Sequence, residues 1–278
     1  MYNLTNKNAS VTVKEMAAEI TSFISKDTNI EYMWQGNPEF WAGRNPILFP
    51  IVGNTWSKDY QIEGKTYSFK SNHGFARSSN FSLVCKDEDS LTLRLKDNED
   101  TYSQYPFHFT LDVEYKLINK RLIITYTITN NDEKDMPFGF GLHPAFNCPM
   151  VENEKFTDYY IEFSNNENQK NLIGPYVLNG NKINLNYEIF KDNPTLIFEN
   201  LNSCYVSITN GKHKVSVSAT GYKWFGIWTK ENAPYVCLEP WMSHSDFSLT
   251  NKDFYNREGT IVLKPETSYT ISYTIEIG

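Results

Sequence analysis

Apolar and polar residues alternate along much of the chain with a period of two. Between residues 111 and 117 every second residue is apolar, and the alternation resumes from Leu122 to Ile128 after the polar pair Asn119-Lys120. A period of two separates the side chains of a strand onto two faces, and a short polar link between two such runs is typical of an antiparallel hairpin. These residues therefore predict a long hairpin with one buried face.

The same pattern predicts further strands. Asn210-Gly211 separates the alternating runs 205–208 and 214–217, and Asn-Gly tolerates the positive φ of a type I′ turn. Glu63-Gly64 links two shorter runs, and residues 268–277 alternate again. Helical periodicity is sparse, and residues 16–24 fit an amphipathic helix or a strand equally well.

Neither a linker rich in Pro, Gly or Ser nor an internal repeat divides the chain. We therefore expect residues 1–278 to form a single all-β domain, a large antiparallel β-sandwich.

Composition and charge narrow the function classes. Of the 278 residues, 40% are hydrophobic and 15% aromatic, which indicates a globular chain with a large core. The net charge of −7 comes without a basic stripe, so we expect no nucleic-acid partner. The N-terminus lacks the pattern of a signal peptide, and the longest apolar stretches, such as residues 46–52, are too short to span a bilayer. Four dispersed cysteines without a CxxC pair favour buried free thiols, and we expect a cytoplasmic protein without membrane contact.

Four segments place ionisable side chains among apolar residues, glycines and prolines. They are Trp41-Ala42-Gly43-Arg44-Asn45-Pro46, Ser71-Asn72-His73-Gly74-Phe75-Ala76-Arg77, Gly139-Phe140-Gly141-Leu142-His143-Pro144-Ala145-Phe146-Asn147, and Val236-Cys237-Leu238-Glu239-Pro240-Trp241.

Two of these residues are candidates for acid–base chemistry. Glu239 stands in an apolar run, where burial would raise the pKa of its carboxyl toward that of a useful base. Its alternative is a structural ion pair or a hydrogen bond to backbone amides. His143 follows two glycines and precedes a proline, and it suits either a proton donor or a core histidine bonded to a carbonyl.

The other candidates would contact substrate. His73 and Arg77 surround Gly74 in a pattern that suits a loop presenting a donor and a cation to ligand oxygens, and Arg44 would act likewise or cap a strand end. Aromatic residues near these segments, Phe146 and Trp241 among them, would supply flat surfaces for sugar rings or simply belong to the core. His244 and Asp246 are possible supporting residues just beyond Trp241.

These segments, in this order, resemble the aldose 1-epimerase (galactose mutarotase-like) superfamily and within it the LacX-like branch. The matching runs are residues 73–77, 141–149 and 238–241, together with the Leu-Phe-Pro-x-Val-Gly segment at 48–53, and the resemblance spans nearly the whole chain. It implies a galactose mutarotase-like supersandwich in which His143 is the general acid, Glu239 the general base, and His73 and Arg77 bind substrate oxygens. Arg44 matches a substrate-contacting arginine of hexose-6-phosphate mutarotases. We find no counterpart of the aspartate that binds sugar hydroxyls in galactose mutarotases proper.

The implied activity is an isomerase that interconverts the α and β anomers of a free aldohexose such as galactose or glucose. One acid and one base suffice for this reaction, without cofactor or metal. Three alternatives remain open. A sugar phosphate would suit Arg44 and Arg77, a non-catalytic carbohydrate-binding protein would use the same fold, and His73, His143 and Glu239 would make a metal site. The protein would be a monomer or a homodimer.

Overall fold

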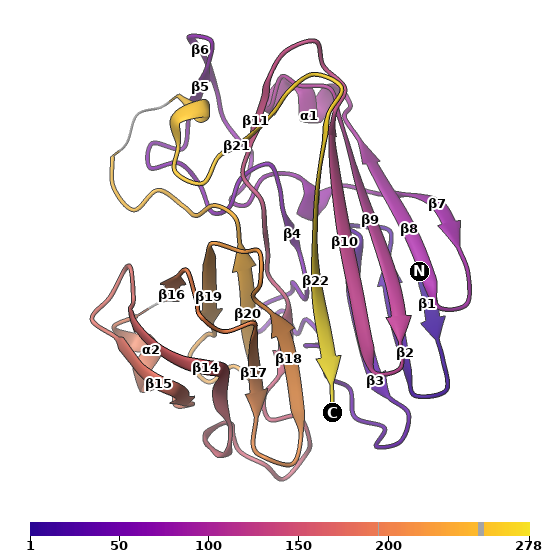
Figure 1. The fold of residues 1–278 in the computed structure, drawn as a ribbon, viewed down its shortest axis with the longest axis vertical. Coiled ribbons are helices and arrows are strands. Elements are labelled where there is room, and N and C mark those ends of the chain that lie inside the picture. Colours follow the sequence, from indigo (N-terminus) through magenta and orange to yellow (C-terminus); the bar gives the residue numbers. More distant parts are fainter. Residues whose placement is uncertain (194, 250–252) are drawn as a thin grey trace.

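Two large antiparallel sheets form the body of the molecule (Figure 1). The computed structural model describes residues 1–193, 195–249 and 253–278. One sheet has nine strands, which run across it in this order: β15 (Val177–Asn184), β14 (Tyr160–Lys170), β17 (Tyr205–Thr209), β18 (Lys214–Ser218), β22 (Ser268–Ile277), β10 (Arg121–Asn130), β9 (Phe109–Ile118), β8 (Ser90–Lys96) and β7 (Ser82–Lys86).

The second large sheet carries the functional residues. Its order is β16 (Leu196–Glu199), β19 (Trp224–Trp228), β20 (Tyr235–Trp241), β12 (Gly141–Leu142) and β4 (Ile47–Leu48), with β13 (Ala145–Asn147) also paired to β20. One face of this sheet packs on the nine-stranded sheet, and one continuous apolar cluster fills the space between them. The sandwich predicted from the alternation is thereby confirmed.

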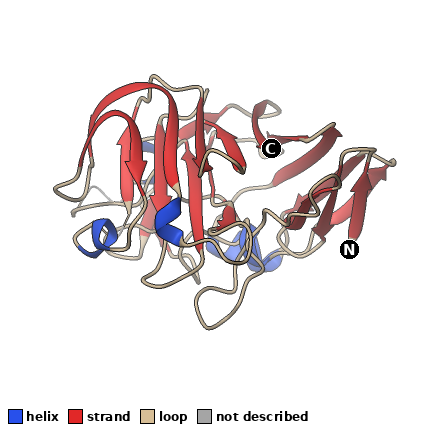
Figure 2. Ribbon diagram, turned by 90° about the horizontal axis from the view of Figure 1, so that it is seen from below, coloured by secondary structure: helices blue, strands red, loops and turns tan. Residues whose placement is uncertain are grey.

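Smaller elements complete the fold. They are the three-stranded sheet of β1 (Tyr2–Thr5), β2 (Ala9–Lys14) and β3 (Glu19–Ser25), the pair β5 (Tyr60–Ile62) and β6 (Lys65–Tyr67), and the pair β11 (Met136–Phe138) and β21 (Ile261–Leu263). The helices are short and lie outside the strand layers (Figure 2): α1 (Glu99–Gln104), α2 (Glu188–Lys191), and the 3-10 turns η1 (Ala76–Ser78), η2 (Phe156–Asp158) and η3 (Phe254–Asn256). Among the described residues no helix is long and apolar enough to cross a bilayer.

The predicted hairpins are confirmed, with one change in a turn. Strands β9 and β10 pair through their full length, and Glu63-Gly64 forms a two-residue turn in which both φ angles are positive. The link between β17 and β18 has four residues instead of two, because Asn210 Oδ1 accepts the N–H groups of Lys212 and His213 and holds a wider loop.

Most of the ambiguous segment at residues 16–24 belongs to a strand. β3 begins at Glu19 after Ala17 and Ala18, which both adopt positive φ and therefore break any helix there.

Candidate functional site

Strand β20 carries the carboxylate of the site. Its side chains alternate, with Val236 and Leu238 in the core between the sheets and Cys237, Glu239 and Trp241 on the opposite face. The candidate base therefore projects away from the main core, into a space that the loops around the sheet enclose.

His143 reaches the same space from the neighbouring chain segment. It follows β12 and precedes β13, both of which pair with β20. Its Nε2 lies 3.3 Å from Oε2 of Glu239. Trp41 packs on the imidazole with ring centroids 4.7 Å apart, and Trp228 meets it edge-on at 5.5 Å, so the ring is fixed in position.

These groups line a cavity of about 520 Å³. Its walls come from segments far apart in the sequence and carry both ionisable and apolar side chains. The lining residues are Trp41, Val52, Gly53, His73, Arg77, His143, Ile173, Thr195, Ile197, Trp228, Lys230, Glu239, Trp241, Ser245 and Phe247.

His73 is locked in the cavity wall as a neutral hydrogen-bond donor. It adopts a left-handed φ of 70°, its N–H donates to the carbonyl of Gly53, and its Nδ1 accepts the N–H of Gly53 at 2.9 Å. The ring proton of neutral His73 must then be on Nε2. Burial, aided by the charge of Arg77, lowers the pKa of His73 to about 4, so the ring stays uncharged at neutral pH.

The Gly-Phe run after His73 is fixed by close backbone contact. A Cβ at Gly74 would lie 2.3 Å from the carbonyl oxygen of Phe49, and Gly74 has a φ of +69°. No side chain fits there, which explains the glycine of this motif.

Arg77 presents a half-buried guanidinium to the cavity. Within the described part of the chain it forms neither a hydrogen bond nor an ion pair. Burial lowers its pKa, while the nearby charge of Glu19 opposes that shift. A partly desolvated guanidinium with free N–H groups is a natural anchor for ligand oxygens.

Burial favours the uncharged forms of both members of the acid–base pair. Burial raises the pKa of the Glu239 carboxyl well above its usual range, and the Trp241 indole N–H only partly opposes this. Burial also lowers the pKa of His143 well below its usual range, helped by His73 and Arg77. Both shifts favour an uncharged carboxyl and an uncharged imidazole, whose Nε2 lies 3.3 Å from Oε2 of Glu239.

Two glycines make a slot for Trp241. Gly226 is the β19 partner of Glu239, and a Cβ there would lie 2.8 Å from Cζ2 of Trp241. A Cβ at Gly141 would lie 2.8 Å from Cδ1 of the same ring. The indole thus lies flat across the sheet beside Glu239, which is the orientation that stacks on a sugar ring.

Two of the predicted substrate contacts do not line this cavity. Phe146 pairs with Val236 in the register of β13 and β20 and therefore points into the core, where it is fully buried. Arg44 is held elsewhere, because its guanidinium donates to the carbonyl of Gln35 and its backbone N–H to Glu19. Neither residue is among those that line the cavity beside Glu239.

The supporting residues beyond Trp241 have structural partners. Asp246 forms a buried ion pair with Arg257 at 2.9 Å, and it accepts the N–H of Trp56. His244 stacks on Phe247 with centroids 4.5 Å apart. They hold the loop whose Phe247 reaches the cavity, so their contribution is to shape its wall.

The sequence patterns did not single out Lys230, Ile197 or Phe247 as part of the site. Lys230 lies exposed beside the cavity and donates to the carbonyl of Phe40. Ile197 pairs with Gly226 and so shares its face of the sheet. Alternation could have placed Ile197 on that face once the strand pairing was known, whereas no sequence signal marks Lys230.

All four cysteines are free thiols, as expected, but only Cys148 and Cys237 are buried; Cys85 and Cys204 are exposed.

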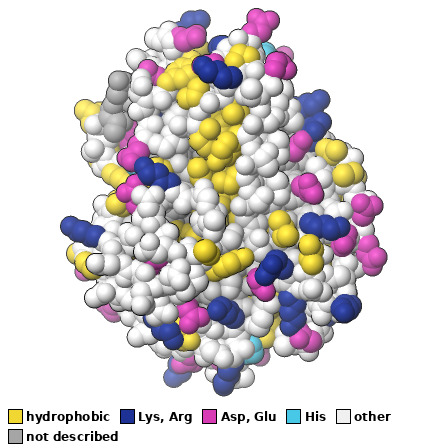
Figure 3. Space-filling model, viewed as in Figure 1, with side chains coloured by type: hydrophobic (Ala, Val, Ile, Leu, Met, Phe, Trp, Pro, Cys, Tyr) yellow, Lys and Arg dark blue, Asp and Glu magenta, His cyan; other side chains and the backbone are white. Residues whose placement is uncertain are grey.

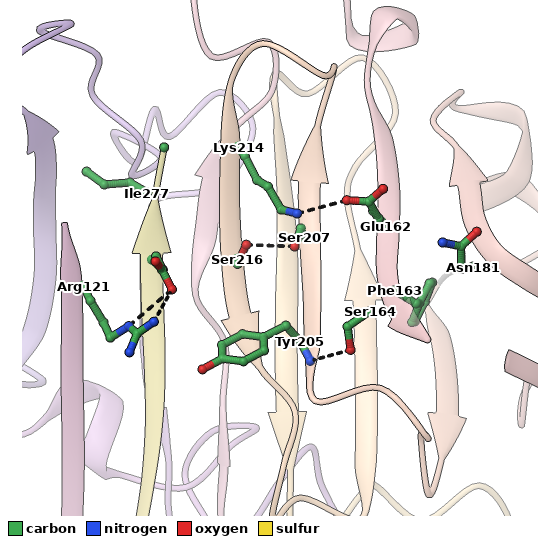
Figure 4. A pocket seen from close by; sticks show the side chains of 12 residues that line it. Arg121, Glu162, Phe163, Ser164, Asn181, Tyr205, Ser207, Lys214, Ser216 and Ile277 are labelled. Atoms are coloured by element: carbon green, nitrogen blue, oxygen red, sulfur yellow. Dashed lines mark hydrogen bonds and ion pairs between the residues drawn. The ribbon is translucent and has the colours of Figure 1, made fainter. Parts of the chain in front are cut away.

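A second cavity of about 540 Å³ lies on the nine-stranded sheet (Figure 4). Its charged side chains neutralise one another, since Lys214 pairs with Glu162 and Arg121 with Glu276. None of the motif residues reaches it. The face of the molecule in Figure 3 likewise intersperses Lys and Arg with Asp and Glu.

Known proteins resemble this chain over nearly its whole length. A model of the family described as aldose 1-epimerase matches residues 1–276. Protein LacX (chromosomal) of Lactococcus lactis subsp. lactis is 33% identical over 260 residues, 86% of each chain. A solved structure of a galactose mutarotase related enzyme from Lactobacillus acidophilus superimposes with a TM-score of 0.92 at 33% identity, covering 100% of this chain and 97% of the other. A galactose mutarotase-like protein from Lactobacillus casei gives 0.92 at 28% identity and full coverage of both chains.

Proposed function

Because the chain belongs to the aldose 1-epimerase family, we propose that it is a cofactor-independent mutarotase of a free aldohexose such as galactose or glucose. The observation that carries this proposal is the 3.3 Å approach of an imidazole and a buried carboxyl inside one cavity. A general acid and a general base held this close serve a reaction that takes a proton from one sugar oxygen and gives one to another.

The steps balance without any other reactant. Glu239 takes the proton of the anomeric hydroxyl while the C1 to ring-oxygen bond breaks and His143 protonates the departing ring oxygen. The product is an open-chain aldehyde, which rotates about its C1–C2 bond and exposes the other face of the carbonyl. Reclosure on that face returns both protons and gives the other anomer.

Substrate binding itself prepares the base. Burial disfavours the Glu239 carboxylate and so favours its protonated form. A sugar hydroxyl that donates to the carboxylate favours its charged form, since hydrogen bonds to a charged form stabilise it. The proton then moves across the 3.3 Å gap to His143, and the pair becomes a carboxylate base and an imidazolium acid.

The remaining lining residues would hold the sugar. His73 offers its Nε2–H, Arg77 offers free guanidinium N–H groups, and Trp241 offers an indole face beside Glu239. A protein that only binds sugar would have no need of both members of the acid–base pair. Their close approach therefore favours catalysis over simple binding.

A sugar phosphate is the second candidate substrate. Among the described residues, the charged side chains that line the cavity apart from Glu239 are the cations Arg77 and Lys230. Together they offer a local positive charge in a chain whose net charge is −7, and guanidinium and ammonium groups are the usual partners of phosphate. Arg44, the arginine that the sequence resemblance implied for this role, is turned away.

Exchange NMR of purified protein with galactose, glucose and their 6-phosphates tests both candidates. Wild-type protein should accelerate anomer exchange above the buffer rate for at least one of these sugars. A preference for phosphates that Lys230→Met weakens would select the second candidate. The mutarotase proposal fails if none of the four exchanges faster than in buffer.

A further inference from the structure

A third ligand-type side chain lies beside the acid–base pair. Cys237 precedes Glu239 by two residues on β20 and shares its face of the strand. One ligand atom each of His143, Cys237 and Glu239 lies within 4.8 Å of the other two. All three residues are buried, and the proposed reaction uses the imidazole and the carboxyl but not the thiol.

Two side-chain atoms of this cluster lack partners. His143 Nδ1 and Glu239 Oε2 are buried without a hydrogen bond to any described residue. The approach of Oε2 to His143 Nε2 does not amount to a hydrogen bond. Buried polar atoms without partners are costly, so Oε2 of Glu239 favours a ligand that accepts its lone pair.

The three ligands suit one class of cation. Imidazole, thiolate and carboxylate together are ligands of zinc, whereas magnesium and calcium prefer oxygen alone. Tetrahedral bonds of about 2.0–2.3 Å place zinc ligands roughly 3.3–3.8 Å apart. His143 and Glu239 already have that separation, and Cys237 needs a shift of about 1 Å at most to match it.

Arg77 lines the same cavity, and its positive charge would repel a cation whose charge is not balanced by its ligands. A divalent zinc ion bound by one thiolate, one carboxylate and one neutral imidazole has no net charge. Arg77 therefore faces a neutral cluster, and the buried site avoids an uncompensated charge. The fourth coordination position would open toward the cavity that Glu239 and His143 line, as in zinc sites with three protein ligands.

We propose that His143, Cys237 and Glu239 form a zinc site whose occupation inhibits the protein by withdrawing the acid and the base from the sugar. The set differs from the trio of His73, His143 and Glu239 that the sequence left open as an alternative, because Nδ1 of His73 is taken by the N–H of Gly53. Zinc binding itself does not depend on the proposed reaction.

Direct metal titration of the full chain tests the site. Zn²⁺ should compete with a chromophoric chelator at one equivalent per chain, and Co²⁺ in its place should give a thiolate charge-transfer band. Cys237→Ser should remove the band and weaken zinc binding by more than about 100-fold, beyond what loss of an outer-shell contact costs. Cys204→Ser removes an exposed thiol and serves as the matched control, with binding and band unchanged.

Two outcomes would overturn the site: equal zinc affinity of Cys237→Ser and wild type, or a cobalt complex without a thiolate band. If Cys237→Ser does not fold, Glu239→Gln decides, because it keeps the thiol and should still lose most of the zinc affinity. In the anomer-exchange assay, zinc should lower the apparent kcat of wild type and of Cys204→Ser. A protein that binds zinc as described but exchanges no anomers would disprove the mutarotase and leave the metal site standing.

Discussion

Replacement of Glu239 by Gln should change activity and stability in opposite directions. Gln has nearly the same shape but neither accepts a proton as a base nor becomes charged. Loss of a general base typically costs about 10²–10⁴-fold in rate. We therefore expect anomer exchange by Glu239→Gln to fall by that factor while the fold is kept.

The stability change follows from the raised pKa of Glu239. A carboxyl whose folded pKa is above its unfolded value stabilises the fold fully only below the unfolded pKa. That contribution is lost as the pH rises through the folded pKa. Each unit of such a shift costs about 1.4 kcal/mol at high pH. Glu239→Gln escapes this cost, so at neutral pH it should be more stable than wild type by at least about 1 kcal/mol, a Tm increase of roughly 2–4 °C.

Thermal unfolding across a pH series measures this difference. The gap in Tm between Glu239→Gln and wild type should be largest at neutral or higher pH and should close near pH 4. Glu167 gives the matched control. It is also a buried carboxylate, but it accepts hydrogen bonds from Asn202 and Ser203. Glu167→Gln should lower stability by about 1–3 kcal/mol and leave anomer exchange unchanged.

The reasoning is refuted if Glu239→Gln is less stable than wild type at neutral pH, or if the gap in Tm does not depend on pH. Undiminished exchange by this variant would remove Glu239 from the mechanism.

Three further substitutions test how the cavity is built. Gly226→Ala should push Trp241 out of its slot and lower kcat/KM by about 10- to 100-fold. The displaced indole should also change the tryptophan fluorescence. The control is Gly211→Ala, in an open hairpin loop, which should cost some stability but no activity. His73→Asn tolerates the left-handed φ but loses the ring donor, so KM should rise about 3- to 10-fold. The pH profile between pH 5 and 8 should keep its shape, because the pKa of about 4 leaves that histidine neutral throughout. Phe146→Leu should lower the free energy of unfolding by about 1–2 kcal/mol and leave KM unchanged, and a raised KM would contradict its place in the core.

Alternation in the sequence predicts much of this fold because it reports which face of a strand is buried. The β9 and β10 hairpin follows from it directly. The two faces of β20 do not, because every residue from Tyr235 to Trp241 is buried. Alternation also explains the error at Phe146. His143 and Ala145 share one face of their segment, so Phe146 takes the other and meets Val236 in the core. The prediction relied on how close Phe146 is to His143 along the chain. Whether a residue is an odd or an even number of positions away decides which face of the strand it takes.

What alternation does not supply is which strands pair and in what register. His143 and Glu239 meet only because β12 and β13 both pair with β20, a contact between distant parts of the chain that no local pattern encodes. The register also decides that Gly226 lies opposite Glu239, and so that the indole of Trp241 has room beside the carboxylate. The same pairing sets the depth at which Glu239 is buried, and burial is the main cause of its raised pKa. The residue types of the site can thus be read from the sequence, whereas the distances and desolvation that make them a working acid and base arise from the sheet.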